Sequence, residues 1–178
     1  MHHHGYLWTG PKHDFDREGL RRPPHPDPPP AATAGDTAAQ RLADRYREAA
    51  AEFPTSDLAP LETALWLMKP ATLIRGTWHE PKEGAAWLRE QLASYAPRFD
   101  SSTRRDSTYL DGLTYSATER MAWGGDVALG FYLDRPAYLS LALVTCSPNR
   151  SSPGLPCPTR EDLRPVRFSP RDREAPPP

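Results

Sequence analysis

The sequence lacks an excess of charge of either sign. Its 178 residues carry 22 Lys and Arg against 23 Asp and Glu, so the formal net charge is −1 at pH 7. A protein that binds nucleic acid through its backbone charge presents a basic surface, and no run rich in Lys and Arg supplies one here. The composition therefore disfavours nucleic acid as a partner.

Long hydrophobic runs are also missing. No apolar stretch approaches the ~20 residues that cross a bilayer, and residues 1–30 lack the basic-then-apolar order of a signal peptide. The sequence thus predicts no membrane partner and a cytoplasmic location. Only two cysteines are present; in a reducing compartment we expect Cys146 to be a small apolar residue ending a strand and Cys157 to be a free thiol.

Recognisable catalytic and cofactor motifs are absent. The chain has no Gly-rich phosphate loop, no Cys/His zinc spacing, no His-Glu-x-x-His helix and no Gly-x-Ser-x-Gly elbow. The question of enzymatic activity stays open at this point, and a protein without such activity is the favoured interpretation.

Proline, by contrast, is abundant and unevenly spread. The chain has 22 prolines, which crowd both ends, whereas average usage is roughly 5%. Pro-rich segments seldom enter a core, so we expect three parts. They are a Pro/His-rich extended leader over residues 1–36, a compact domain over 37–146 and a Pro/Arg-rich tail over 147–178.

A β-hairpin is the strongest structural prediction. Apolar residues alternate over 127–133 and again over 139–144, and Asp134-Arg135-Pro136-Ala137 forms the turn between them. Helical spacing predicts helices over about 37–52, from about 59 to Pro70, over 81–96 and over about 102–123, with a strand over 71–78. The fold class is therefore α+β, a small antiparallel sheet whose hairpin packs against about four helices.

The leader contains an unusual group of aromatic residues, and the hairpin has a face of small residues. These features suggest a segment that binds the domain or a partner protein, against the alternative of a mobile leader with a few solvated aromatics. On the first interpretation, Trp8→Ala loosens the segment and leaves the core folded. The candidate partner-binding residues are Tyr6, Leu7, Trp8, Phe15, Gly130, Tyr132, Tyr138 and Ser140.

The first three residues offer a possible metal site. A free α-amine at Met1, two backbone amides and the imidazole of His3 can form a square-planar set of four nitrogens, which suits Cu(II) or Ni(II). His2 supplies one of the amides. Against this, a histidine run in a flexible segment lacks supporting groups and is also typical of a purification tag. We therefore expect no cofactor and keep Cu(II) or Ni(II) binding at Met1, His2 and His3 as an alternative.

A weaker candidate for chemistry lies between the strand over 71–78 and the helix that begins at Pro81. Arg75 and His79 flank this connection, where backbone N–H groups favour an anion or a proton transfer. Asp126 is a third candidate for such a catalytic site. A histidine in a loop is more often a hydrogen-bonded surface residue, and no nucleophile lies beside this one in the sequence.

Three segments carry a resemblance to other proteins: Met1 to Pro11, Pro60 to Trp78 and Trp123 to Asn149. Through them the chain resembles a group of small uncharacterised proteins of high-GC Gram-positive bacteria. The resemblance implies an actinobacterial origin and no mechanism. The function predicted from sequence is therefore a non-enzymatic accessory or protein-interaction protein, with metal binding and a small enzyme as alternatives.

Overall fold

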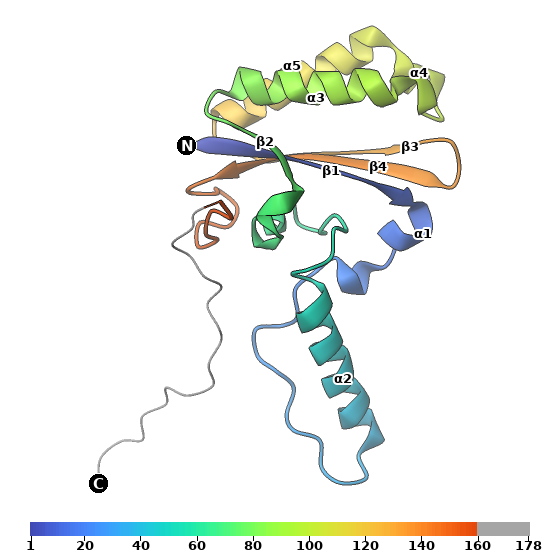
Figure 1. Ribbon diagram of the computed structural model, residues 1–178, viewed down its shortest axis with the longest axis vertical. Coiled ribbons are helices and arrows are strands. Elements are labelled where there is room, and N and C mark those ends of the chain that lie inside the picture. The colour runs from blue at the N-terminus through green and yellow to red at the C-terminus, as the bar shows by residue number, and fades with distance from the viewer. Residues whose placement is uncertain (160–178) are drawn as a thin grey trace, which may run out of the picture.

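The computed structural model describes residues 1–159, and its centre is a four-stranded antiparallel sheet. The strands are β1 (His2–Pro11), β2 (Ile74–Trp78), β3 (Val127–Tyr132) and β4 (Ala137–Cys146), in the spatial order β2-β1-β4-β3. This architecture confirms the predicted α+β class, and Figure 1 shows the helices of residues 81–122 on one side of the sheet and the elements of residues 12–73 on the other.

The predicted hairpin is confirmed. Strands β3 and β4 pair with Val127 opposite Leu143 and Phe131 opposite Leu139, so their large apolar residues share one face. Helices α3 (Pro81–Tyr95) and α5 (Ser107–Ala122) cover that face. Leu88, Leu92 and Met121 complete this core with no exposed surface. The period-two pattern of the hairpin thus fixes the position of the main core.

The helices follow their predicted limits with two exceptions. Helix α2 (Thr37–Glu52) begins at its cap Asp36, whose side chain accepts from the Ala39 N–H. The helix expected over 102–123 is divided into α4 (Ser102–Arg105) and α5, because Asp106 caps a new helix by accepting from the Tyr109 N–H. The helix expected from residue 59 is instead the 3₁₀ helix η2 (Thr63–Met68).

The prediction of an extended leader over residues 1–36 is wrong for its first part. Residues 2–11 form β1, an inner strand that pairs with β4 along its whole length and with β2 near its start. Backbone hydrogen bonds to two neighbouring strands, in addition to side-chain burial, hold this segment in the sheet. The compact unit therefore begins at His2 and not at residue 37.

The second face of the sheet is covered by the segment that follows β1. Tyr6 stacks on Trp66 of η2 with ring centroids 4.6 Å apart, and Phe15 packs against Tyr138 at 4.4 Å. The guanidinium of Arg21 lies 3.6 Å from the Phe15 ring and donates to the Ala59 carbonyl at 2.7 Å. A second core therefore forms on the face that the sequence suggested for a partner.

The prediction of a tail over residues 147–178 is also wrong for its first part. After β4 the chain turns back against the sheet, and Asn149 and Cys157 are buried. The side chain of Asn149 holds this loop, since its oxygen accepts from the N–H groups of Ser151 and Ser152. The tail predicted beyond residue 159 lies outside the described residues. Among residues 1–159, no helix combines the length and the apolar character that a membrane span requires.

Candidate metal centre

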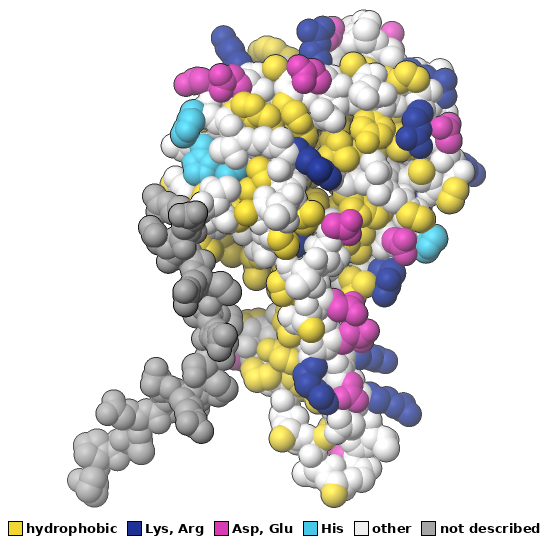
Figure 2. Space-filling view, viewed as in Figure 1, with side chains coloured by type: hydrophobic (Ala, Val, Ile, Leu, Met, Phe, Trp, Pro, Cys, Tyr) yellow, Lys and Arg dark blue, Asp and Glu magenta, His cyan; other side chains and the backbone are white. Residues whose placement is uncertain are grey.

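Two histidines and two cysteines from distant parts of the chain meet at one end of the sheet. The residues are His2, His4, Cys146 and Cys157, and one potential donor atom of each lies within 4.8 Å of all the others. Figure 2 shows histidine side chains gathered at the edge of the molecule where Figure 1 places the N-terminus. We call these four residues the His/Cys cluster.

The strand geometry explains how the His/Cys cluster forms. Alternation along β1 places His2 and His4 on one face and His3 on the other. The β1–β4 register sets His2 directly opposite Cys146. Cys157 then arrives from the loop after β4, and its sulfur lies 3.5 Å from Nε2 of His2.

The distances among three of the four donors match those around a single tetrahedral ion, and Cys146 lies within 4.8 Å of the other three. The two Nε2 atoms are 3.2 Å apart, and Sγ of Cys157 lies 3.5 Å from that of His2 and 3.6 Å from that of His4. Zinc–nitrogen and zinc–sulfur bonds of ordinary length at tetrahedral angles give about 3.4 Å between two nitrogens and about 3.6 Å between nitrogen and sulfur. The three donors therefore need little movement to bind one ion.

Burial makes the His/Cys cluster a nearly closed site. His4, Cys146 and Cys157 are buried, and His2 is half-buried. Four protein donors fill a tetrahedral coordination sphere, as in structural zinc sites, whereas catalytic zinc sites keep one position for water or substrate. His2 lies on the solvent side, and the ring of exposed His79 is 5.9 Å from its own.

Hydroxyl groups surround the donors. Nδ1 of His4 lies 2.8 Å from Oγ1 of Thr77, and it donates to this oxygen when Nε2 is free to hold a metal. Sγ of Cys146 lies 3.3 Å from the Ser147 hydroxyl, and Sγ of Cys157 lies 3.1 Å from that of Thr159. Such outer contacts orient ligands and tune their basicity in metal sites.

Tyr6 adds a further group beside the thiols. Its hydroxyl is buried and has no hydrogen-bond partner among residues 1–159. Burial, followed by the charges of Cys146 and Cys157, raises the pKa of this hydroxyl, so it stays a neutral donor. A phenol of this kind suits a site where metal binding converts thiols into thiolates, which accept hydrogen bonds.

The protonation states of the donors differ before a metal binds. Burial, with the nearby charges of His2 and His3, lowers the pKa of His4 to about 4, so its imidazole is neutral at pH 7. Burial raises the pKa of the Cys146 thiol to about 11, and Cys157 adds to this effect. Metal binding must therefore displace at least the proton of Cys146.

This difference predicts a pH dependence of metal affinity. Between about pH 6 and about pH 8 the apparent affinity for Zn²⁺ should rise about tenfold per pH unit for each thiol proton displaced. Protonation of His4 does not compete in this range, because its pKa of about 4 lies well below it. Competition titrations with a chromophoric chelator at several pH values measure the slope. An affinity independent of pH would mean that no thiol is a ligand.

The predicted square-planar site at Met1, His2 and His3 is not what the structure forms. The ring of His3 is fully buried on the opposite face of β1, where Nδ1 lies 3.0 Å from Oγ1 of Thr145. Residues 2 and 3 also belong to a strand paired on β4, so their backbone is held in an extended form. His2 is the one member of the predicted set that joins the His/Cys cluster, where its imidazole replaces its amide as the donor.

The weak catalytic candidates do not form one site. Arg75 is exposed on β2, and among the described residues no hydrogen bond or ion pair joins it to His79 or Asp126. Asp126 accepts instead from the Thr145 N–H at 2.8 Å and from the Asn149 amide at 2.9 Å. Burial raises the pKa of Asp126, although the Asn149 and Thr145 hydrogen bonds oppose this effect.

The predicted partner-binding residues differ in their exposure to solvent. Tyr6 and Trp8 are core residues, 0% and 7% exposed, while Leu7 and Phe15 are half-buried. Tyr138 and Ser140 are half-buried beneath Phe15 and η2, beside a small cavity of about 150 Å³, and Gly130 and Tyr132 stay exposed. Of the two alternatives for this segment, the structure thus shows binding to the domain, and Tyr6 and Trp8 are not accessible to a partner.

Local motif searches miss the His/Cys cluster because its donors come from both ends of the described chain. The one signal in the sequence is the His-x-His alternation at the start of an apolar, period-two stretch, which places two imidazoles on one side of a strand. Comparison with family models, with curated proteins and with solved structures found no match to this chain.

Proposed function

We propose that this chain is a metal-binding protein that holds one Zn²⁺ ion in the His/Cys cluster. The observation that supports this most strongly is the convergence of four potential donor atoms within 4.8 Å of one another, with the three distances among His2, His4 and Cys157 suiting one tetrahedral ion. Thiolates favour Zn²⁺ or Cu(I), and a tetrahedral set disfavours the square-planar Cu(II) and Ni(II) considered from sequence. The sequence predicted Cu(II) or Ni(II) at Met1, His2 and His3 as an alternative. The proposal retains metal binding but assigns it to the His/Cys cluster and to Zn²⁺.

The proposed role of the ion is structural. It would join the start of β1, the end of β4 and the loop that carries Cys157, three segments that no disulfide links, since both cysteines are free thiols. A four-ligand site of this kind contributes its binding energy to folding, because the unfolded chain does not present the donors together. The metal would fasten the N-terminal strand to the rest of the sheet.

Metal content and thermal stability test the proposal directly. The purified chain should bind one equivalent of Zn²⁺, and a thousandfold excess over the dissociation constant should stabilise it by about 4 kcal/mol. For a chain of this size that corresponds to an increase in melting temperature of roughly 8–16 °C, reversed by a chelator. A melting temperature that is unchanged by both Zn²⁺ and chelator would disprove a structural ion.

The accessory or protein-interaction role stays a prediction. Its basis shifts from the N-terminal aromatic residues, most of which belong to the second core, to helix α2. This helix projects from the body of the molecule, has no buried residue and exposes 55% of Leu42.

A further inference from the structure

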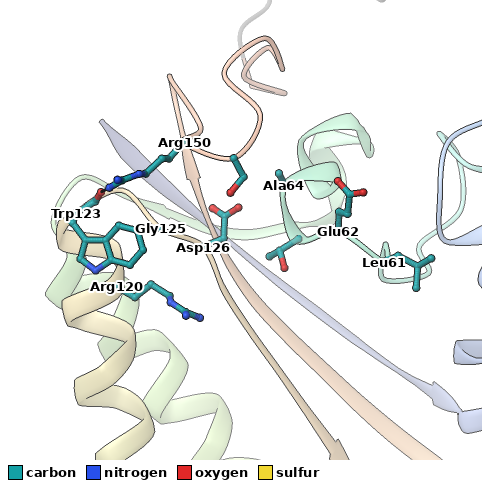
Figure 3. Close-up of a pocket in the computed structure, with 10 residues that line it drawn as sticks. Leu61, Glu62, Ala64, Arg120, Trp123, Gly125, Asp126 and Arg150 are labelled. Carbon is teal, nitrogen blue, oxygen red and sulfur yellow. Dashed lines mark hydrogen bonds between the residues drawn. The ribbon is translucent and has the colours of Figure 1, made fainter. Parts of the chain in front are cut away.

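A cavity of about 640 Å³ lies beside the loop that carries Cys157. Its walls come from four segments: the residues that begin η2, the end of α5, the start of β3 and the loop after β4. Figure 3 shows Arg120, Trp123 and Arg150 on one side of this cavity, with Asp126 between them and the η2 side. No residue of the His/Cys cluster lines it.

Two guanidinium groups, of Arg120 and Arg150, line the cavity together with the carboxylates of Glu62 and Asp126. Arg150 donates through Nη1 to the Trp123 carbonyl at 3.2 Å, which uses one of its five N–H donors. Arg120 has no carboxylate within ion-pair distance among residues 1–159, and it extends toward the cavity in Figure 3. Arginine presents a planar fork that pairs with a carboxylate through two parallel hydrogen bonds.

No acidic side chain among residues 1–159 forms an ion pair with Arg120 or Arg150. Both carboxylate oxygens of Asp126 accept hydrogen bonds from Asn149, and one of them also accepts from the Thr145 N–H. Glu62 belongs to the opposite, η2 side of the cavity and is exposed. Burial raises the pKa of Asp126 and the charge of Arg120 acts to lower it, but no ion pair within residues 1–159 occupies the Arg120 guanidinium, which leaves its N–H donors for an external anion.

An indole ring lies beside the two cations. Trp123 is 53% exposed, and the guanidinium of Arg150 lies 5.0 Å from its ring centre. Gly125 allows this arrangement, because a Cβ at that position would approach atoms of Trp123 and Arg120 to 2.8–2.9 Å. A flat apolar ring next to a guanidinium matches a ligand with an aromatic ring and a carboxylate.

The loop after β4 connects this cavity to the His/Cys cluster. It begins after Cys146, contributes Arg150 and Ser151 to the cavity and reaches Cys157. An ion bound to both cysteines would fix the two ends of the loop, and Asn149 already fixes its first residues by donating to Asp126 and to the Thr145 carbonyl. If the metal has already ordered the loop, the loop loses less conformational entropy when a ligand binds.

We propose that this cavity binds a small aromatic carboxylate, held by Arg120 and Trp123, and that Zn²⁺ in the His/Cys cluster raises its affinity by ordering the loop 147–157. The second part rests on the proposed function, whereas the first part depends only on the cavity. The two sites are coupled and do not share a ligand atom.

The test uses the full chain loaded with Zn²⁺ and benzoate as the probe, followed through the indole N–H signal of Trp123 by NMR. Benzoate should shift this signal saturably, whereas benzamidine, which has the same ring and a positive charge, should not. Arg120→Gln should weaken benzoate binding at least tenfold. Arg41→Gln, on exposed helix α2, is the matched control and should leave the affinity unchanged. Removal of zinc should weaken binding severalfold.

Each result separates the cavity from the metal site. If zinc binds and benzoate does not, or if benzamidine shifts the signal equally, the cavity proposal is overturned and the proposed function stands. If benzoate binds equally well with and without zinc, the coupling is overturned and the carboxylate site stands. If the chain binds no zinc, the proposed function and the coupling both fail, and benzoate binding alone decides the first part.

Discussion

A chain that lacks residues 1–11 is expected not to fold. These residues form β1, which lies between β2 and β4, so the deletion leaves the sheet divided and removes the core residues Tyr6 and Trp8. Loss of a buried aromatic side chain costs about 3–5 kcal/mol each, whereas a whole domain has a stability of about 5–15 kcal/mol. Far-UV circular dichroism and thermal denaturation measure the outcome.

A second deletion controls for loss of chain length. Residues 26–31 belong to the irregular Pro-rich segment before α2, and five of the six are exposed. Their removal should lower the melting temperature only slightly, since surface loops tolerate changes in length. A cooperative transition in the chain without residues 1–11 would show that β1 is dispensable and contradict the observed fold.

His4→Asn is expected to lower the affinity for Zn²⁺ by more than about 100-fold, because outer hydrogen-bond partners alone are worth 10–100-fold in metal sites. Asparagine keeps an N–H near Nδ1 that can donate to Thr77 but lacks the Nε2 donor atom. His3→Asn is the matched control, since it makes the same change on the opposite face of the strand. Competition with a chromophoric chelator measures both variants.

The expected pattern across the ligands is equally specific. Cys157→Ser should lower the affinity about as much as His4→Asn, while His3→Asn should keep nearly the wild-type value. The reverse result, loss with His3→Asn and no change with Cys157→Ser, would support the N-terminal set of Met1, His2 and His3 and overturn the His/Cys cluster.

The sequence predicts those elements that are determined by residues close together in the chain. Alternation in 127–133 and 139–144 establishes the hairpin, and the caps and prolines define helices such as α2 and α3 to within a few residues. The strand β1 was missed although His2, His4, Tyr6 and Trp8 alternate as clearly. Its histidines and the prolines that follow it are typical of an extended leader outside the core, and its partners lie in β2 and β4, far away in sequence.

The metal site depends on the same long-range information. His2 and Cys146 become neighbours only through the β1–β4 register, which a single sequence does not reveal, and Cys157 reaches them through the loop that Asn149 holds. The sequence did indicate that the N-terminal histidines were the place to look for a metal. In a flexible segment the imidazole of His3 completes a local four-nitrogen set with the amine and two amides, whereas the strand brings His4 to the cysteines.

The coordination of bound zinc tests the central claim most directly. X-ray absorption at the zinc edge of the loaded full chain should show two sulfur ligands at about 2.3 Å and two nitrogen ligands at about 2.0–2.1 Å. Cys157→Ser should reduce the sulfur count to one, while His3→Asn should leave the spectrum unchanged. A wild-type spectrum that contains nitrogen and oxygen ligands alone would contradict the His/Cys cluster as the site of the ion.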